Sequence, residues 1–406
     1  MSRRLTAKTT RLSVVPRLTK MVPPAGAAVW ITPSTSLVGF GQVLRLGPCG
    51  GSDRFETLAG RLQELFSEAH ITDDVDLPGS GPMAFGSFTF DENDADSAMV
   101  IPELIYGVSD DAAWKTEMSI DPPDFNSTGR AGNQSRLTAG DDSSVHWNRI
   151  CLEAQDKLAD GTVEKVVLAR KVLKELQGEP DEGEIVRHLA DAYPGCFTFA
   201  FERMVGASPE LLVRRLGDIV ESMPIAGSAP RGADAADDDL IGAGLIASAK
   251  NQTEHEITKR DVVDKLAPFC SQMEVEATPS LLLLANVQHL STKVQGKLNG
   301  HYSALQLAGA LHPTAAVCGM PNREAMDFIR MAEGFDRGRY AAPVGWMDHR
   351  GDGEWALALR CADIGDSSAG LYAGAGIVSA SVAEAEFEET EIKLKAILSA
   401  LNRGVA

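Results

Sequence analysis

The chain has 406 residues, enough for one large domain or two ordinary ones. Its 44% hydrophobic and 23% charged content is typical of a soluble globular protein. The formal net charge of -19 disfavours a nucleic-acid-binding function, because a surface that follows phosphates needs an excess of Lys and Arg. An anionic substrate would require locally placed cations or a metal ion.

The six cysteines contain no pair spaced as Cys-x-x-Cys, so the sequence predicts neither a disulfide framework nor a structural zinc site. Reduced cysteines favour a cytoplasmic location. No run of about 18 apolar residues occurs, and we therefore expect no membrane-spanning helix.

The N-terminal region begins with a basic segment that lacks the apolar core of a secretory signal. A mitochondrial-type presequence has such a composition, but we expect residues 1–22 to be a flexible tail, because chain termini are commonly disordered. Residues 23–144 mix short apolar runs with Gly/Pro turns, include a predicted helix at 58–70, and form the N-terminal part of the same fold. The polar, turn-rich stretch 121–144 is a predicted linker or surface loop.

The remainder of the chain alternates between two hydrophobic periods. Helical spacing occurs at 145–161, 184–192, 240–268, 303–310, 323–334 and 382–402, and strand alternation at 163–173, 197–202, 211–222, 355–364 and 371–378. Runs of strands with helices inserted between them predict an α+β fold with large, mostly antiparallel, sandwich-like sheets flanked by helices. A doubly wound fold is the alternative, but no Gly-rich phosphate loop follows any strand.

The segment TVEKVVLARKV, residues 162–172, predicts a strand with Lys165, Val167 and Ala169 on one face. One interpretation is an edge strand whose lysine extends to water. The other is a pocket, because faces of small residues also occur in CFTFAFE, EWALALRCA and LYAGAGIV. Open space beside a charge is typical of a binding site for a polar ligand.

Several glutamates are candidates for metal binding. Glu386 and Glu389 are three residues apart and lie together on the C-terminal helix, away from its apolar stripe. Such a pair near a helix start is usually solvated and stabilised by the helix dipole. With a further carboxylate, such as Glu254 in another helical segment, the pair would suit Mg²⁺, which prefers oxygen ligands and keeps part of its water shell.

Eleven short segments then follow one another in chain order: KVVLAR, FTFAFE, GASPELLV, PIAGSAPRG, SAKNQTEH, NVQHL, LHPTAAVCGMP, EGFDRGRYAAPVGW, GDGEWALALRCA, LYAGAGIV and EAEFEETEIK. This ordered set resembles the chorismate-utilising enzyme family and, within it, most closely the isochorismate synthases. The resemblance implies a single catalytic domain with the fold of anthranilate synthase component I, and a chorismate-binding region at 145–404. Residues 1–144 match the pattern of the family poorly.

The resemblance also implies a role for each matching residue. Lys165 is the expected general base that activates water for attack at ring carbon 2 of chorismate, and Glu210 is the expected general acid that protonates the departing 4-hydroxyl. Mg²⁺ is the implied cofactor, held by Glu254 and Glu389, with Glu386 acting through water. The implied substrate-binding residues are Ser228, His289, Arg360, Tyr372 and Gly374.

Two positions indicate which nucleophile is used. Family members that make anthranilate from ammonia carry glutamine at the position of Lys165, and the aminodeoxychorismate enzymes carry a second lysine where this chain has Ala226. Water is therefore the expected nucleophile, and the implied reaction is the Mg²⁺-dependent isomerisation of chorismate to isochorismate for menaquinone or siderophore biosynthesis. No amidotransferase subunit is expected, and the resemblance favours a monomer.

Elementary chemistry asks for the same residue types. Chorismate is a dianion, so an acidic protein has to place Arg and a divalent cation at its carboxylates. Displacement of a hydroxyl needs an acid at the leaving group and a base at the water. We therefore expect Lys165 to be buried so that it can lose its proton, and Glu210 to occupy a pocket that keeps it protonated.

Two other functions stay open at this point. A salicylate synthase, which forms isochorismate and then eliminates pyruvate in the same site, would share every residue named above. A non-catalytic ligand-binding module would carry the glutamates as surface charge only, and would show neither turnover nor a response to Mg²⁺.

Overall fold

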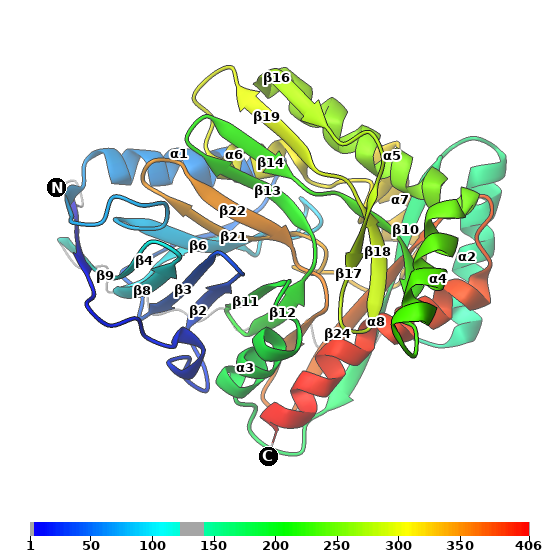
Figure 1. Ribbon diagram of the computed structural model, residues 1–406, viewed down its shortest axis with the longest axis horizontal. Coiled ribbons are helices and arrows are strands. Elements are labelled where there is room, and N and C mark those ends of the chain that lie inside the picture. The colour runs from blue at the N-terminus through cyan, green and yellow to red at the C-terminus, as the bar shows by residue number, and fades with distance from the viewer. Residues whose placement is uncertain (1–3, 122–141, 406) are drawn as a thin grey trace.

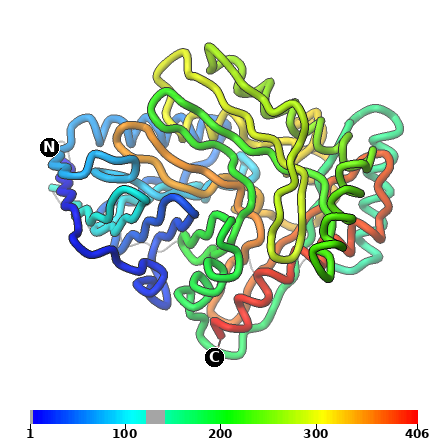
Figure 2. The backbone as a smooth tube through the Cα atoms, viewed as in Figure 1, coloured from blue at the N-terminus to red at the C-terminus, as the bar shows by residue number. Residues whose placement is uncertain are grey.

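The computed structural model describes residues 4–121 and 142–405. Two large β-sheets form the body of the molecule, and helices cover them on the outside and at one end (Figure 1). A smaller sheet of three strands lies at that end (Figure 1). The backbone trace shows the N-terminal third of the chain at the opposite end (Figure 2).

The larger sheet has twelve strands, in the spatial order β20 (Gly319–Met320), β10 (Lys165–Glu175), β24 (Ser368–Ile377), β23 (Cys361–Ile364), β12 (Met204–Ser208), β11 (Phe197–Phe201), β2 (Ala28–Ile31), β3 (Thr35–Phe40), β8 (Leu104–Ser109), β9 (Ala113–Asp121), β1 (Arg4–Arg11) and β5 (His70–Asp73). The second sheet has nine strands, in the order β16 (Cys270–Val275), β19 (Val294–Leu298), β14 (Ile219–Ser222), β13 (Leu211–Leu216), β22 (Gly353–Leu357), β21 (Pro343–Asp348), β6 (Met83–Ser87), β7 (Ser97–Ile101) and β4 (Leu44–Cys49). The third consists of β15 (Ile225–Pro230), β18 (Val287–Ser291) and β17 (Ser280–Leu283).

Neighbouring strands of these sheets run antiparallel in the described part of the chain, apart from β1 and β5. The helices are α1 (Arg54–Ser67), α2 (Ser144–Ala159), α3 (Glu182–Ala192), α4 (Ala235–Ala247), α5 (Ala249–Leu266), α6 (Ala304–Leu311), α7 (Asn322–Ala332) and α8 (Ala383–Gly404), with 3-10 turns η1 (Leu18–Lys20) and η3 (Ala267–Phe269). The predicted α+β class with large, mostly antiparallel sheets is confirmed.

Two hydrophobic cores follow from the alternation of side chains along the strands. Trp30 of the larger sheet and Trp346 of the second sheet belong to the main core, which contains residues of both sheets. Val29, the neighbour of Trp30, instead belongs to a second core together with Leu189 of α3 and Leu401 of α8. Successive strand residues point to opposite faces, so both faces of the larger sheet are buried here.

The segment Arg4–Arg11 is a strand, and the prediction of a flexible tail over 1–22 is wrong for it. β1 pairs with β9 along its whole length and with β5 on its other side. Leu5, Ala7 and Thr9 are buried, while Thr6 and Lys8 between them are exposed. The tail prediction relied on the common disorder of chain termini and overlooked this alternation of period two.

Three predicted elements are each divided in two. The helix predicted over 240–268 is α4 followed by α5, because Ser248 has extended backbone angles and its hydroxyl caps α5 by accepting from the Asn251 N–H. The strands predicted at 211–222 and 355–364 are the pairs β13/β14 and β22/β23. Of the polar stretch 121–144, residues 122–141 lie outside the described residues. None of the helices in the described ranges is long and apolar enough to cross a membrane.

Candidate active site

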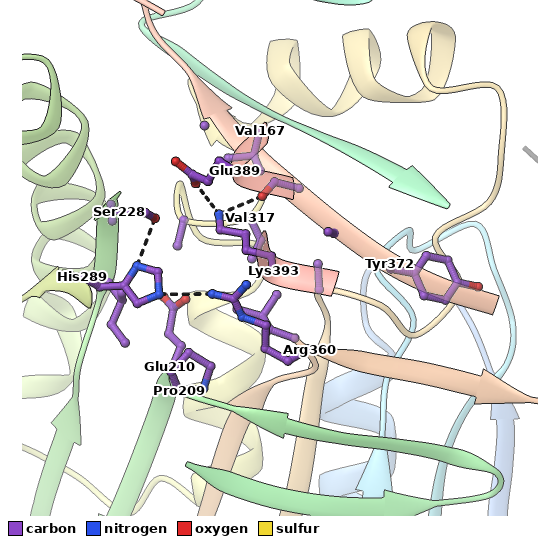
Figure 3. Close-up of a pocket in the computed structure, with 18 of the residues that line it drawn as sticks. Val167, Pro209, Glu210, Ser228, His289, Val317, Arg360, Tyr372, Glu389 and Lys393 are labelled. Carbon is purple, nitrogen blue, oxygen red and sulfur yellow. Dashed lines mark hydrogen bonds and ion pairs between the residues drawn. The ribbon is translucent and has the colours of Figure 1, made fainter. Parts of the chain in front are cut away.

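A cavity lies where the three-stranded sheet meets β10, β24 and α8 (Figure 3). The predicted site residues that line it are Glu210, Ser228, Glu254, His289, Arg360, Tyr372, Gly374 and Glu389. Lys165 and Glu386 are buried behind this surface.

Lys165 is the first residue of β10, and its side chain is fully buried. Its Nζ donates to Thr258 Oγ1 at 2.9 Å and lies 3.2 Å from Glu254 Oε1. A Cβ atom at Gly376 would come within 2.2 Å of this Glu254 oxygen, so only glycine leaves room for the pair. The alternative of an edge lysine that extends to water is therefore wrong.

Glu210 lies in the turn between β12 and β13 and is only 5% exposed. Its backbone N–H donates to Ser208 Oγ at 3.2 Å, which fixes the turn. Burial raises the pKa of Glu210 to about 8, although the Lys165 charge acts in the opposite direction. The carboxyl group is therefore protonated at neutral pH and can donate a proton. Figure 3 shows it beside the contact between His289 and Arg360.

Ser228 and His289 face each other across β15 and β18. A bulge at Gly227, whose φ is +75°, precedes Ser228 and brings its hydroxyl to 3.0 Å from His289 Nδ1. On the other side of the ring, Arg360 Nη2 donates to Nε2 at 3.1 Å. A guanidinium can only donate, so Nε2 carries the lone pair and Nδ1 carries the hydrogen. Burial, followed by the Arg360 charge, lowers the pKa of His289 to about 3, and the imidazole is neutral.

Arg360 supplies a cation with a spare donor. It lies between β22 and β23 with a φ of +51°, so the alternation of the EWALALRCA segment does not continue regularly to Arg360. Its Nη1 is buried and has no hydrogen-bond partner among the described residues. A buried donor without a partner costs about 1–3 kcal/mol or more, and an anionic ligand would remove this cost.

Each of the three candidate metal ligands has a lysine partner. Glu254 contacts Lys165, as described above, and Glu389 Oε1 lies 2.6 Å from Lys393 Nζ. Glu386 Oε1 lies 2.6 Å from Nζ of Lys250, away from the cavity surface. Within residues 4–121 and 142–405, no three His, Cys, Asp or Glu side chains converge closely enough to hold a metal ion. The predicted three-glutamate cluster is therefore not formed, although Glu254 and Glu389 share the cavity.

The electrostatic surroundings of the two α8 carboxylates differ. Burial alone would raise the pKa of Glu389, but the Lys393 charge lowers it to about 2. Burial, followed by the nearby Glu389 charge, raises the pKa of Glu386. Glu389 therefore stays ionised across the physiological pH range.

Lys393 and Tyr340 also line the cavity, and the sequence analysis gave them no role. Lys393 Nζ donates to the Gly374 carbonyl at 2.9 Å, and its position four residues after Glu389 was the available signal. The Tyr340 ring stacks on Tyr372, with centroids 5.0 Å apart. The Tyr372 hydroxyl donates to Asp363 Oδ2 at 3.1 Å and points away from the other labelled residues (Figure 3).

The faces of small residues contribute unequally. Val167 of β10 lies opposite Gly376 of β24, and both line the cavity, as expected. Thr198 and Ala200 of the CFTFAFE segment lie elsewhere. Among the predicted faces of small residues, those of β10 and β24 line the cavity and that of CFTFAFE does not.

The site combines a protonated carboxyl and a guanidinium with a spare donor in the cavity with a buried lysine beside them. Such a combination is typical of an enzyme that performs acid–base chemistry on a small anionic compound.

The family model described as chorismate binding enzyme matches residues 111–402, and the chain belongs to this family. The chain is 34% identical over 388 residues to isochorismate synthase DhbC of Bacillus subtilis (strain 168), with 93% of this chain and 94% of the relative covered. The solved structure of MenF, the menaquinone-specific isochorismate synthase from Escherichia coli, has a TM-score of 0.79 at 22% identity, over 98% of this chain and 95% of the other. Anthranilate synthase component I from Streptococcus pneumoniae TIGR4 has a TM-score of 0.68 at 20% identity, with 90% and 92% covered. The last two likenesses concern the fold alone.

Proposed function

We propose that the protein is an isochorismate synthase, an isomerase that converts chorismate to isochorismate by addition of water at ring carbon 2 and loss of the 4-hydroxyl. The observation that carries this proposal is a pair of buried proton-transfer groups: Glu210 lines the cavity, and Lys165 is buried against Glu254, which also lines it. The name of the Bacillus subtilis relative, which matches nearly the whole chain, supports it. The product would enter either menaquinone or siderophore biosynthesis.

In this proposal, substrate binding, proton donation and proton acceptance are carried out by different residues. Arg360 Nη1 binds a substrate carboxylate, and His289 holds the guanidinium in place from behind. Glu210 donates its proton to the leaving 4-hydroxyl. Lys165 accepts a proton from the attacking water.

The charges of the site support a requirement for Mg²⁺. The charge of each of the three glutamates is offset by one lysine, and His289 is neutral. Among these glutamates, their lysines, His289 and Arg360, Arg360 is therefore the one cation without a carboxylate partner. Chorismate would bring two carboxylates, and the second would need another positive charge. Glu254 and Glu389 together with water and substrate oxygens would suit Mg²⁺, which is commonly held by one or two carboxylates.

When bound, Mg²⁺ would neutralise the ring carboxylate and withdraw electron density from the ring. The contact of Glu254 with Lys165 is relevant here, because a carboxylate shared with a metal ion holds an ammonium group less strongly. Thr258 would then remain as the hydrogen-bond partner of the amine.

The test is incubation of the purified protein with chorismate and Mg²⁺, followed by chromatographic identification of the product. We expect isochorismate from the single chain, without an amidotransferase subunit, and a monomer in gel filtration. Release of salicylate and pyruvate would instead identify a salicylate synthase. An ammonia-dependent product would identify an aminating enzyme, and no turnover with or without Mg²⁺ would overturn the enzymatic proposal.

A further inference from the structure

A second arginine of the cavity, Arg337, differs from Arg360 because the protein itself uses nearly all of its hydrogen-bond donors. Its Nε donates to Glu333 Oε2 at 2.9 Å, and its Nη1 donates to the Val317 carbonyl at 2.7 Å. Its Nη2 donates to the Val167 carbonyl at 2.8 Å and also to Glu333 Oε1. Four of the five N–H donors of the guanidinium are therefore used by the protein itself. The charge is offset by a carboxylate that is equally buried.

The backbone groups bound by this pair lie on one edge of β10. On that side, β20 pairs with β10 only at Lys165 and Val166, and one further bond joins the Val167 N–H to the Cys318 carbonyl at 2.8 Å. The next groups on the same edge are the Val167 carbonyl and the Ala169 N–H. Arg337 satisfies the first, and Glu333 Oε1 accepts from the second at 2.8 Å. Two side chains thus take the place of a neighbouring strand.

The same pair joins three separate segments around the cavity. Val167 belongs to β10, Val317 to the loop before β20, and the pair itself follows α7. Both valines line the cavity, and Lys165 lies two residues before Val167 on the same strand. Buried ion pairs are weak evidence for stability, because apolar residues of similar volume often do as well. Here the Glu333–Arg337 pair matters because it fixes the geometry of the backbone groups that it binds.

We propose that Glu333 and Arg337 are positioning residues that fix the edge of β10, and with it the placement of Lys165 and Val167 against the bound substrate. This inference rests on the proposed function. Neither residue touches a reacting atom. Arg360 binds the substrate because it has a spare donor, and Arg337 holds the strand because it has almost none.

The kinetic test compares Arg337→Lys with Arg214→Lys. Lysine keeps the charge but cannot span the carboxylate and both carbonyls. For Arg337→Lys we expect kcat to fall at least about tenfold while KM for chorismate changes less than about threefold, because loss of alignment reduces the chemical step. Arg214 is the matched control, since it binds Glu221 and Glu354 in the second sheet, outside the cavity. A raised KM with unchanged kcat for Arg337→Lys would overturn the proposal and indicate direct substrate binding.

The structural test uses the double substitution Glu333→Met, Arg337→Met, which removes both charges together so that no buried charge is left unpaired. We expect the backbone amides of residues 166–170 to exchange with deuterium at least about tenfold faster than in the parent protein, and kcat to fall as in Arg337→Lys. Unchanged exchange and unchanged kcat would overturn the positioning role while leaving the proposed function intact. If the parent protein forms no isochorismate, the proposed function fails, and the exchange experiment still decides whether the pair holds the strand.

Discussion

The site has two parts with contrasting surroundings for a cation: the Arg360 end at the cavity surface, and the Lys165 end, which is buried next to the cavity residue Glu254. At the Arg360 end, the guanidinium is supported by the neutral His289 ring, and one of its nitrogens has no partner among the described residues. At the Lys165 end, Nζ already contacts Glu254 and Thr258. The first end is ready to bind an anion, whereas the second is balanced in charge before any ligand arrives.

This difference indicates that burial alone does not define what a charged residue does. Arg360 and Lys165 are both buried, but they differ in the number of donors that the protein leaves unused. Arg360 is therefore suited to hold a substrate, and Lys165 to exchange a proton once its carboxylate partner is engaged elsewhere. The predictions below separate these two tasks.

The largest effect is expected at the Lys165 end. Lys165→Ala should lower kcat by about 10²–10⁴-fold or more, because one proton transfer is lost. Chorismate binding measured by calorimetry with Mg²⁺ should stay within a few-fold of the parent value, since the Arg360 end is unchanged. Lys174→Ala, a change at the far end of the same strand, is the control. Full activity of Lys165→Ala would refute the role of general base.

Glu210→Gln should lower turnover to a similar extent, by about 10²–10⁴-fold, because glutamine cannot supply the proton for the leaving group. The acid must be protonated to act, and the pKa of Glu210 is about 8. The kcat/KM of the parent protein should therefore fall as the pH rises through this value. The residual kcat/KM of Glu210→Gln should not show this fall at high pH. A normal rate in the variant would remove Glu210 from the mechanism.

A smaller effect is expected at the Arg360 end. Arg360→Lys removes the planar pair of donors, and a charge-assisted hydrogen bond is worth about 1.5–3 kcal/mol. KM for chorismate should rise about 10- to 100-fold, while kcat changes much less. Steady-state kinetics of Arg360→Lys, with Arg214→Lys as the control, would check this. A large loss of kcat at unchanged KM would show that the two ends do not divide the tasks as described.

The smallest effect concerns the response to metal. In Glu254→Gln and Glu389→Gln we expect the Mg²⁺ concentration for half-maximal activity to rise about tenfold or more, because each change removes a charged oxygen ligand. Glu388→Gln, at an exposed neighbouring position on α8, is the control. Unchanged Mg²⁺ titrations of activity in both variants would exclude the proposed metal site.

The sequence predicted those features that depend on local periodicity. The strand that carries Lys165, the helix that carries Glu386 and Glu389, and the small face of β24 follow from alternation or from spacings of three and four residues. The expected role of each residue came from the family resemblance and not from periodicity.

Other features depend on contacts between distant segments. The position of Arg360 depends on a break with positive φ inside a segment that alternates like one strand. The pairing of Lys165 with Glu254 depends on how α5 packs against the start of β10. The Glu333–Arg337 pair satisfies backbone groups that no local pattern identifies as unpaired.

The position of β9 in the larger sheet has a practical consequence. The family match begins at residue 111, two residues before β9, whose two neighbours in the sheet, β8 and β1, both precede that point. A recombinant fragment that begins there would expose unpaired strand edges and part of the main hydrophobic core to water. Such a fragment is expected to aggregate, because a boundary of sequence similarity is not a boundary of autonomous folding.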